Sequence, residues 1–405
     1  MNVAIVGNGI LGLQTAYRLI RTDPTVRVTL IGPVDRPGSA SKAAAAMLHA
    51  FCEVDTATLT HAPERRKFLF NKTANRLWPG VLKELSAAAE RPIPHGFGTF
   101  LINNHATDPQ EDRNFEMVLA TVREFDEPVQ TVQPSDIPHY KPAASRINRA
   151  IYLPREGWVH PVALLDALDE ALRRSGRVHV VNEACERLIV TAGRIAAVEL
   201  TSKDRVIADH VVLCPGANFS RIVEKSDLGI PFMPVFYGIG ATLRLKTGAE
   251  TLTHCVRTPN RGLAGGVYGV PQEAGHTLIG ASSLIAPEPE YNPRLTSIHA
   301  LIKAATEQIN ENFGHSELVQ VNVGWRPTSA DLLPLIGPTS ISNLLVATGT
   351  KRDGLHASPM ISQALTDLLL RGTTSYDLSL FNPERPRTSE IPAELLPLQR
   401  AGHWR

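Results

Sequence analysis

The sequence predicts a mixed α/β fold of two domains, and three observations support it. Residues 2 to 31 contain a strand, a helix and a second strand, as in a Rossmann-type nucleotide-binding domain. Residues 232 to 285 alternate apolar and polar positions in the manner of an antiparallel sheet. With 405 residues, 43% of them apolar, the chain is long enough to bury two cores. We therefore expect the second domain to be mainly an antiparallel sheet.

The elements are expected in the following order. Residues 2 to 6 and 26 to 31 are predicted to be buried strands around a helix at about residues 10 to 21. A helix over residues 161 to 174 begins with a proline, and several short strands follow it up to residue 214. The later elements are a helix over 295 to 313, a strand over 344 to 347, a helix over 359 to 371 and an extended tail after 382.

Changes of composition along the chain divide these elements between two discontinuous domains. The expected first domain comprises residues 1 to 88, 147 to 225 and 322 to 376. The expected second domain, formed by two insertions, comprises residues 89 to 146 and 226 to 321, and residues 377 to 405 are a C-terminal tail.

The composition favours a small-molecule partner. The formal net charge is +1, so the chain carries no broad electrostatic footprint for nucleic acid or an anionic membrane. We assign no role to the compact basic run Arg65-Arg66-Lys67, which is typical of a solvated helix face. Four widely spaced cysteines indicate neither a metal site nor a disulfide framework, and no signal peptide or membrane span is recognised, so we expect a cytoplasmic protein. A homo-oligomer is left open.

A glycine-rich turn follows the first strand. The stretch VGNGILGLQTA contains Gly7, Gly9 and Gly12 with the spacing Gly-x-Gly-x-x-Gly, between a strand and a helix. In dinucleotide-binding folds the first glycine makes the tight turn, the second lets backbone amides approach a pyrophosphate, and the third lets helix and strand pack closely. The turn therefore predicts a bound dinucleotide, and it does not choose between NAD and FAD.

The second strand lacks the carboxylate that usually binds the adenosine ribose, about 20 residues after the glycines. Gly32 occupies that position. Asp35 is close enough in sequence to reach back to the ribose, although an exposed turn residue is the simpler interpretation. We therefore expect other residues to fix the cofactor.

The stretch GSASKAAAAML, residues 38 to 48, offers such contacts. Its small residues and the Ser41 hydroxyl suit a phosphate, and its alanines let the backbone approach a flat ring, although an alanine run is also typical of a plain helix. Residues 43 to 48 resemble the alanine-rich segment of the FAD-dependent D-amino-acid oxidase superfamily, and within it the glycine oxidase branch, with Ala46 in place of a glycine. The resemblance implies FAD, bound non-covalently.

The resemblance also implies which residues contact FAD. Residues 156 to 168 and 211 to 220 resemble two further segments of the family. The residues implied for the dinucleotide part are Gly7, Gly9, Ile10, Leu11, Gly12, Ala40, Ser41, Lys42, Cys185 and Gly216. The residues implied for the flavin ring are Ala45, Ala46, Met47, Thr350, Lys351, Arg352, Asp353, Gly354, Leu355 and His356.

The C-terminal segments VGWRPTSADLLPLIG and LLVATGTKRDGLHASP carry the most specific match. By resemblance, Arg326 binds the substrate carboxylate and Arg352 lies close to flavin and substrate. A guanidinium group suits this role because its planar fork pairs bidentately with a carboxylate. Ser358 and Pro359 suit the cap and first residue of the last helix, whose positive end would then face the flavin.

Several further side chains have two interpretations each. By resemblance Tyr268 faces the substrate as a catalytic-site residue, although a tyrosine on an amphipathic strand is often a core residue. Trp325 and Tyr237 either shape the pocket or fill the core. Lys351 either faces the flavin, where its charge would assist the reaction with oxygen, or lies at the surface. His49 is a remote candidate for covalent attachment of the flavin.

The implied reaction is oxidation of a carbon–nitrogen bond in an amino acid or related amine. Hydride passes to flavin N5, the imine hydrolyses, and O2 accepts the electrons to give hydrogen peroxide. One alternative is an FAD-dependent dehydrogenase that passes electrons to a quinone or carrier. Alternatives of another class are a flavin monooxygenase, whose Gly-Asp motif is absent, and a non-catalytic nucleotide-binding protein, against which Arg326 and Arg352 argue. The identity of the substrate is left open.

Overall fold

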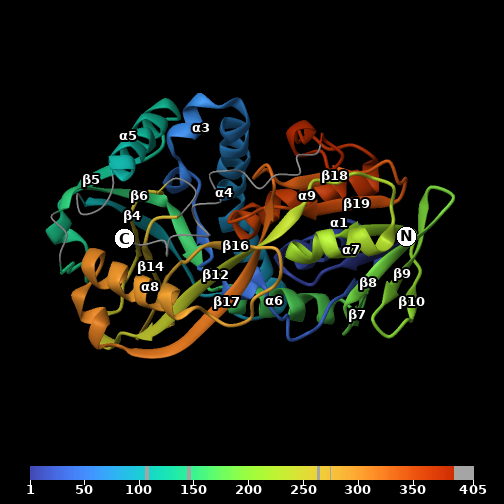
Figure 1. Ribbon diagram of the computed structural model, residues 1–405, viewed down its shortest axis with the longest axis horizontal. Coiled ribbons are helices and arrows are strands. Elements are labelled where there is room, and N and C mark those ends of the chain that lie inside the picture. Colours follow the sequence, from blue (N-terminus) through green and yellow to red (C-terminus); the bar gives the residue numbers. More distant parts are fainter. Residues whose placement is uncertain (105–108, 144–146, 262–264, 274, 387–405) are drawn as a thin grey trace.

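The predicted α/β architecture is confirmed by a computed structural model, which describes residues 1–386 apart from 105–108, 144–146, 262–264 and 274 (Figure 1). One large sheet is mostly parallel and the other mostly antiparallel. The predicted tail after residue 386 lies outside the described residues.

The first sheet has six strands in the order β18-β19-β11-β1-β2-β7. Their bounds are β1 Asn2–Val6, β2 Arg27–Ile31, β7 Val178–Val181, β11 His210–Leu213, β18 Leu335–Pro338 and β19 Leu344–Thr348. All neighbouring pairs are parallel except β18 with β19. Apolar side chains occupy both faces of β1, since Val3 and Ile5 enter one core while Ala4 and Val6 enter another. Burial on both faces is typical of a parallel sheet.

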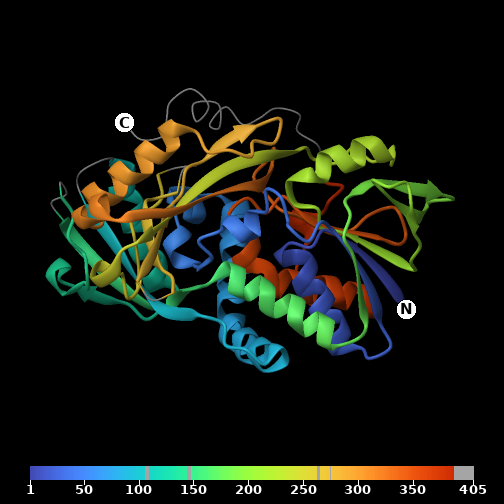
Figure 2. The same cartoon turned by 90° about the horizontal axis from the view of Figure 1, so that it is seen from below.

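Helices cover one face of this sheet, and a small sheet covers the other (Figure 2). The helices are α1 Ile10–Thr22, α4 Ala62–Ala89, α6 Pro161–Arg174 and α9 Gly354–Arg371. The opposite face carries a three-stranded sheet with the helix α7 Phe219–Ser226, and its strands are β8 Cys185–Thr191, β9 Arg194–Leu200 and β10 Arg205–Val206. These bounds confirm the β-α-β unit and the helix predicted over residues 161 to 174.

The second sheet has ten strands, eight of them in a row and two paired at its sides. The row runs β16-β12-β15-β14-β13-β4-β6-β3, while β17 pairs with β12 and β5 pairs with β6. The bounds are β3 Met47–Leu48, β4 His95–Asn104, β5 Gln130–Val132, β6 Ile147–Val159, β12 Val235–Lys246, β13 Cys255–Arg257, β14 Tyr268–Pro271, β15 His276–Gly280, β16 Leu284–Ala286 and β17 Glu317–Ser329. The antiparallel pairing expected for residues 232 to 285 is confirmed for β12 with β15 and β16.

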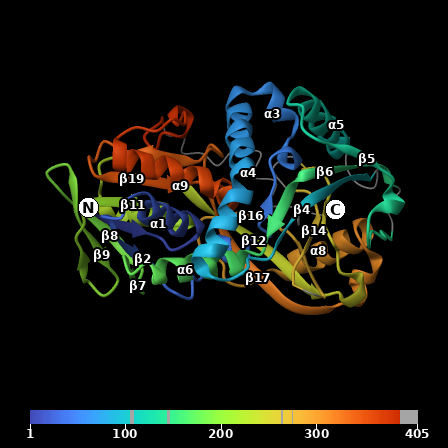
Figure 3. The same ribbon diagram turned by 180° about the vertical axis from the view of Figure 1, so that it is seen from behind.

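Two helices pack against opposite faces of this sheet. α8 Leu295–Gln308 contributes Leu301 to a core with Phe100, and α5 Pro109–Glu124 contributes Phe115 to a core with Leu101. Phe100 and Leu101 are neighbours on β4, so their side chains point to opposite faces. Figure 3 shows α4 running between the two sheets. Two short helices complete this region, α2 Ala40–Ala43 and α3 Thr56–Thr60.

The limits of the two domains remain a prediction, and two strands fall differently from the expected boundaries. β6 and the end of β17, which we expected in the first domain, are hydrogen bonded to β4 and β12 in the ten-stranded sheet. β6 begins at the expected boundary at residue 147, and β17 continues across the expected boundary at residue 322. Composition therefore does not show which sheet each strand joins. None of the helices in the described residues is both long and apolar enough to cross a lipid bilayer.

The start of the last helix was predicted wrongly. α9 begins at Gly354, with Asp353 as its N-cap, rather than at Pro359. A proline inside a helix removes the N–H that would bind the carbonyl four residues earlier. Here the Ser358 hydroxyl donates to that carbonyl, Leu355 O, at 2.8 Å. The helix therefore continues through Pro359 because its neighbour replaces the missing donor.

Candidate active site

A cavity of about 430 Å³ lies where the two sheets meet. Its wall combines the loop after β1, the alanine-rich segment after β2, the turn after β11, strands β12, β14 and β17, and the start of α9. The sequence-predicted residues that line it are Gly7, Gly9, Ile10, Leu11, Ala40, Ser41, Ala45, Ala46, Met47, Cys185, Gly216, Tyr268, Arg326, Thr350, Lys351, Arg352, Asp353, Gly354, Leu355 and His356. Segments far apart in the sequence therefore meet at one cavity, as expected.

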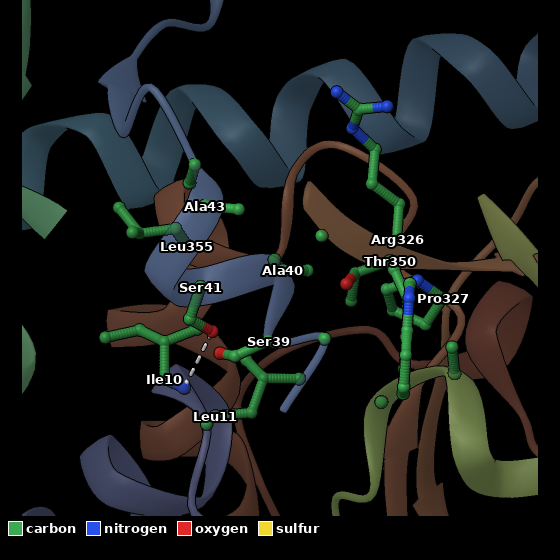
Figure 4. A pocket seen from close by; sticks show the side chains of 18 of the residues that line it. Ile10, Leu11, Ser39, Ala40, Ser41, Ala43, Arg326, Pro327, Thr350 and Leu355 are labelled. Atoms are coloured by element: carbon green, nitrogen blue, oxygen red, sulfur yellow. Dashed lines mark hydrogen bonds between the residues drawn. The ribbon is translucent and has the colours of Figure 1, made fainter. Parts of the chain in front are cut away.

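The glycine turn forms one end of the cavity. Gly7 has φ +108°, and a Cβ there would collide with the Cys214 carbonyl, so only glycine fits. The first turn of α1 faces the cavity, and Ile10 N donates to Ser41 Oγ at 3.0 Å (Figure 4). Free N–H groups at a helix start favour an anion such as a pyrophosphate.

Two of the predicted contacts lie outside the cavity wall. Gly12 packs against Gly7, whose carbonyl a Cβ at position 12 would strike, so its role is the close approach of helix and turn. The Lys42 side chain is exposed, and its Nζ donates to Asp35 O at 3.4 Å. Asp35 is itself exposed and does not line the cavity, in agreement with its interpretation as a turn residue.

The alanine-rich segment carries the chain from the first sheet into the second. Ala46 adopts φ +53°, a left-handed conformation that favours glycine, which accounts for the glycine of the resembling sequences. The following turn is held by the buried carboxyl group of Glu156. That group accepts hydrogen bonds from the backbone N–H of Ala50 and Phe51 at 2.8 and 2.9 Å. Burial raises the pKa of Glu156 to about 7, against the effect of these donors.

Arg326, on β17, is a cation without an anionic partner. Its Nη1 donates to the Ser282 carbonyl at 3.0 Å, and no carboxylate of the described residues forms an ion pair with it. The guanidinium group lies on Gly240, where a Cβ would collide with it. Burial and the charge of Arg352 both lower the pKa of Arg326 from its ordinary value. Figure 4 shows Arg326 on the opposite side of the cavity from Ile10 and Ser41.

Arg352, in contrast, has a carboxylate partner. Its Nη2 lies 3.5 Å from Glu53 Oε2, to which the Asn260 amide donates at 3.1 Å. Glu53 Oε1 pairs with Arg257, which is 1% exposed. Burial alone would raise the pKa of Glu53, but Arg257 and Arg352 hold it well below its ordinary value. Glu53 therefore stays ionised and orients Arg352.

Tyr268 belongs both to the cavity wall and to a core. It is 7% exposed and packs in a cluster with Trp158 and Cys255. Burial raises the pKa of its hydroxyl to about 12, although Arg326 and Arg257 act in the opposite direction. The hydroxyl group lies beside Gly280, where a Cβ would come within 2.8 Å of it. Tyr268 is therefore a core residue that also lines the cavity, and its role toward the substrate stays a prediction.

Lys351 lies in the cavity wall with a left-handed backbone, φ +50°. Burial, followed by the charges of Arg352 and Lys67, lowers the pKa of its amine to about 7. Lys67 was expected at a solvated face with Arg65 and Arg66, and this expectation was wrong. Lys67 Nζ pairs with Asp353 at 3.2 Å, and both side chains are largely buried. The basic run therefore supplies one charge to the site through α4.

Trp325, Tyr237 and His49 lie in or next to the cavity wall. Trp325 lines the cavity. Tyr237 does not line it, and its ring packs edge-on against the Trp325 ring, with the two centroids 5.6 Å apart. His49 is buried in the wall. Its Nε2 lies 2.9 Å from Thr99 Oγ1 and its Nδ1 lies 3.3 Å from Arg257 Nη1, so both ring nitrogens have partners.

Sequence reasoning missed several polar or glycine residues of the wall, among them Asn8, Arg36, Glu53, Gly240 and Arg257. Glu53 and Arg257 are 204 positions apart, and no local pattern joins them. Asn8 stands inside the glycine turn, where a polar residue between two glycines was a visible signal.

Comparisons with known proteins agree with this geometry. The sequence profile of the DAO family, described as FAD dependent oxidoreductase, matches residues 2–368. A glycine oxidase from Geobacillus kaustophilus is 27% identical over 390 residues, which are 95% of this chain and 97% of that protein. The crystal structure of glycine oxidase from the same organism has a TM-score of 0.80, with 24% identity over 95% of this chain and 98% of that chain. An iminodiacetate oxidase from Chelativorans sp. BNC1 has a TM-score of 0.79, with 19% identity over 94% and 98%.

Proposed function

The chain belongs to the DAO family of FAD-dependent oxidoreductases, and from this premise we propose that it oxidises the carbon–nitrogen bond of an amino acid or a related amine. The observation that carries the proposal is Arg326, a cation in the cavity wall that no described carboxylate neutralises. A partly buried charge without an anionic partner is unfavourable, so the site gains from binding an anion there. The glycine oxidase relative, named for an amino-acid substrate, supports the same class of substrate.

The residues present fit FAD. A Cβ at Gly7 or Gly12 would collide with neighbouring backbone, so these glycines allow the start of α1 to lie at the cavity. Gly324 likewise allows β17 to lie close to Ala40 and Ala43. We propose that the amides at the start of α1 and Ser41 hold the pyrophosphate, and that Ala45, Ala46 and Met47 with the start of α9 border the ring. When bound, FAD supplies the hydride acceptor, and the protein supplies position and charge.

The charges of the wall favour the reactive form of the substrate. Arg326 pairs with the substrate carboxylate, and Ser282 O and Gly240 hold its guanidinium in place. Glu53 neutralises only part of the charge of Arg257 and Arg352, so the region stays positive. A positive surrounding lowers the pKa of the substrate ammonium group, which favours the neutral amine that can lose hydride.

Peroxide release tests the proposal. The purified protein reconstituted with FAD would be given amino acids, secondary amines such as N-methylated glycine, and larger amino compounds. We expect peroxide release with compounds that carry a free carboxylate, and little or no peroxide release with their methyl esters. Arg326→Ala should raise KM by about 100-fold, since a charge-assisted pair contributes up to about 3 kcal/mol. Arg326→Lys keeps the positive charge, so it should raise KM by less. An Arg326→Ala enzyme with unchanged KM would contradict the role of Arg326.

The proposal also covers the electron acceptor, the cellular location and self-association. We propose O2 as the electron acceptor, and reduction of a quinone or dye without peroxide would favour a dehydrogenase instead. We propose the cytoplasm as the location, which fits four cysteines that are all unpaired. Self-association is compatible with this function, and a solution mass would measure it.

A further inference from the structure

The adenosine end of the cavity lacks the side chain on which dinucleotide-binding folds rely. A carboxylate after the second strand normally accepts hydrogen bonds from the ribose hydroxyls. Here β2 ends at Ile31 and the next residue is Gly32. Asp35 is exposed and outside the wall, so it does not take this role.

The Asn8 side chain occupies the space that a side chain at position 32 would need. A Cβ built on Gly32 would lie 2.6 Å from both Cγ and Oδ1 of Asn8, well inside van der Waals contact. Any residue larger than glycine at position 32 is therefore incompatible with the present position of Asn8. The two positions are coupled, because the asparagine stands where the carboxylate side chain would begin.

The orientation of this amide leaves an acceptor free. Asn8 Nδ2 donates to Pro33 O at 2.8 Å, which fixes the amide and directs Oδ1 elsewhere. No described residue donates to Oδ1. Asn8 is only 8% exposed, and it lines the cavity together with Gly32 and Pro33. Asn8 Oδ1 is not among the fully buried atoms that lack a partner, so it stays accessible. A ligand in the cavity can therefore donate a hydrogen bond to this oxygen.

Arg36 holds the turn in this position. Its Nε donates to Asn8 O at 2.8 Å, and its Nη2 pairs with Asp169 of α6 at 2.6 Å. The Arg36 side chain is 11% exposed and its backbone adopts φ +52°. The Asn8 backbone is thus tied to α6, and its side chain is tied to Pro33.

We propose that Asn8 Oδ1 accepts a hydrogen bond from the ribose hydroxyls of the FAD adenosine, in place of the carboxylate missing at Gly32. This inference rests on FAD binding, which the family membership establishes. The substitute is a neutral amide in the first turn instead of an anion at the end of the second strand. An amide does not titrate, so this contact is independent of pH in the range where a carboxylate would become protonated.

The affinity of the apoprotein for FAD, measured by titration calorimetry, tests the proposal without relying on activity. Asn8→Ala should weaken binding by about 10-fold, the loss of one good hydrogen bond. An FAD analogue without the adenosine ribose hydroxyls should bind the wild type about 10-fold more weakly than FAD does. The Asn8→Ala variant should bind this analogue and FAD with equal affinity. The matched control is Asn182→Ala, because Asn182 accepts from Val34 N at 2.8 Å in the same loop but is exposed and outside the wall. It should keep the wild-type affinity.

A reciprocal exchange separates the ribose contact from damage to the turn. Gly32→Glu alone should weaken binding, since its Cβ would meet Asn8. The double variant Asn8→Gly with Gly32→Glu should recover affinity to within about 3-fold of the wild type, because it restores the usual carboxylate. Unchanged affinity of Asn8→Ala, or equal weakening for FAD and the hydroxyl-free analogue, would overturn the proposal. Failure of the wild type to bind FAD would instead overturn the proposed function.

Discussion

At the residue scale, the site depends on how four charged side chains share partners. Arg257 and Arg352 both pair with Glu53, whereas the Arg326 side chain forms no ion pair among the described residues and donates to the Ser282 carbonyl. A guanidinium that is already paired has less to gain from a second carboxylate. This division is why we propose that Arg326, and not Arg352, binds the substrate carboxylate.

Gly240 positions the guanidinium group of Arg326, so its substitution should act on substrate and spare FAD. In Gly240→Ala the new Cβ would collide with that group and displace it. We expect KM for a carboxylate substrate to rise by about 10-fold, because misplacement weakens a bidentate pair. Steady-state kinetics measure this effect, and the affinity for FAD serves as the internal control. Equal losses of FAD and substrate affinity would contradict the assignment.

Lys351 should make anion binding depend on pH near neutrality. Its pKa is lowered to about 7, so the amine is charged below that pH and neutral above it. A carboxylate ligand that cannot be oxidised should therefore bind a few-fold more tightly at pH 6 than at pH 8.5. Lys351→Met should remove this dependence, and Lys351→Arg should bind tightly throughout. Dissociation constants across the pH range measure it. A dependence that persists in Lys351→Met would exclude the lysine as its source.

Ala46 should be a point of strain that glycine relieves. A left-handed alanine costs about 1 kcal/mol, and Ala46 has φ +53°. We expect Ala46→Gly to raise the free energy of unfolding of the apoprotein by about 0.5–1 kcal/mol. Ala45 is equally buried and does not have a positive φ, so Ala45→Gly should lower it. Chemical denaturation compares the two variants. Equal destabilisation by both would show that packing, and not backbone strain, governs position 46.

The residues that could be predicted are those with a local signature. Gly7 and Gly9 follow from the spacing of a turn, and Arg326 follows from the motif around it. Glu53 and Asn260 could not be predicted, because their role arises only where distant segments meet. Lys67 was misjudged because a charge run on a helix gives no indication of which residue faces inward.

At the scale of elements, α9 illustrates how a proline is accommodated close to a site. Pro359 lacks the N–H that would bind Leu355 O, and the Ser358 hydroxyl takes its place at 2.8 Å. The helix can then begin at Gly354, which brings its N-terminus to the cavity wall. Residues 354 to 358 are therefore helical although the sequence pattern favours a cap at Ser358.

Ser358 should stabilise this first part of α9. Ser358→Ala should lower the free energy of unfolding by about 1 kcal/mol, because a buried carbonyl loses its donor. In the double variant Ser358→Ala with Pro359→Ala, the new N–H can bind Leu355 O, so part of the loss should return. Ser362→Ala is the control, since the Pro359 carbonyl that Ser362 binds at 2.9 Å can also accept the normal helical bond. Thermal or chemical denaturation measures these differences, and a double variant no better than Ser358→Ala would refute the explanation.

Elements with a strong period were predictable, and their exact assignment to sheets was not. The apolar period of α1 and the proline at the start of α6 fixed both helices closely. Residues 147 to 159 were expected in the first domain, whereas β6 pairs with β4 in the second sheet. A strand's partner depends on tertiary packing that its own residues do not encode.

At the scale of the whole molecule, the cavity exists because the chain crosses repeatedly between two sheets. The segment after β2 leads through Ala46 into β3 of the second sheet. The end of β17 lies beside the segment before α9, because Thr328 and Thr350 form a β-bridge. The parallel sheet supplies the glycine turn, and the antiparallel sheet supplies Tyr268 and Arg326. One ligand can therefore contact both sheets.

An anaerobic titration of the FAD-loaded protein, followed by flavin absorbance at about 450 nm, tests directly whether Arg326 selects amines that carry a carboxylate. We expect that an amine with a free carboxylate bleaches this band, that its methyl ester does so far less, and that Arg326→Ala abolishes the difference between them. Bleaching by a reduced nicotinamide but by no amine, or equal bleaching by acid and ester in the wild type, would contradict it.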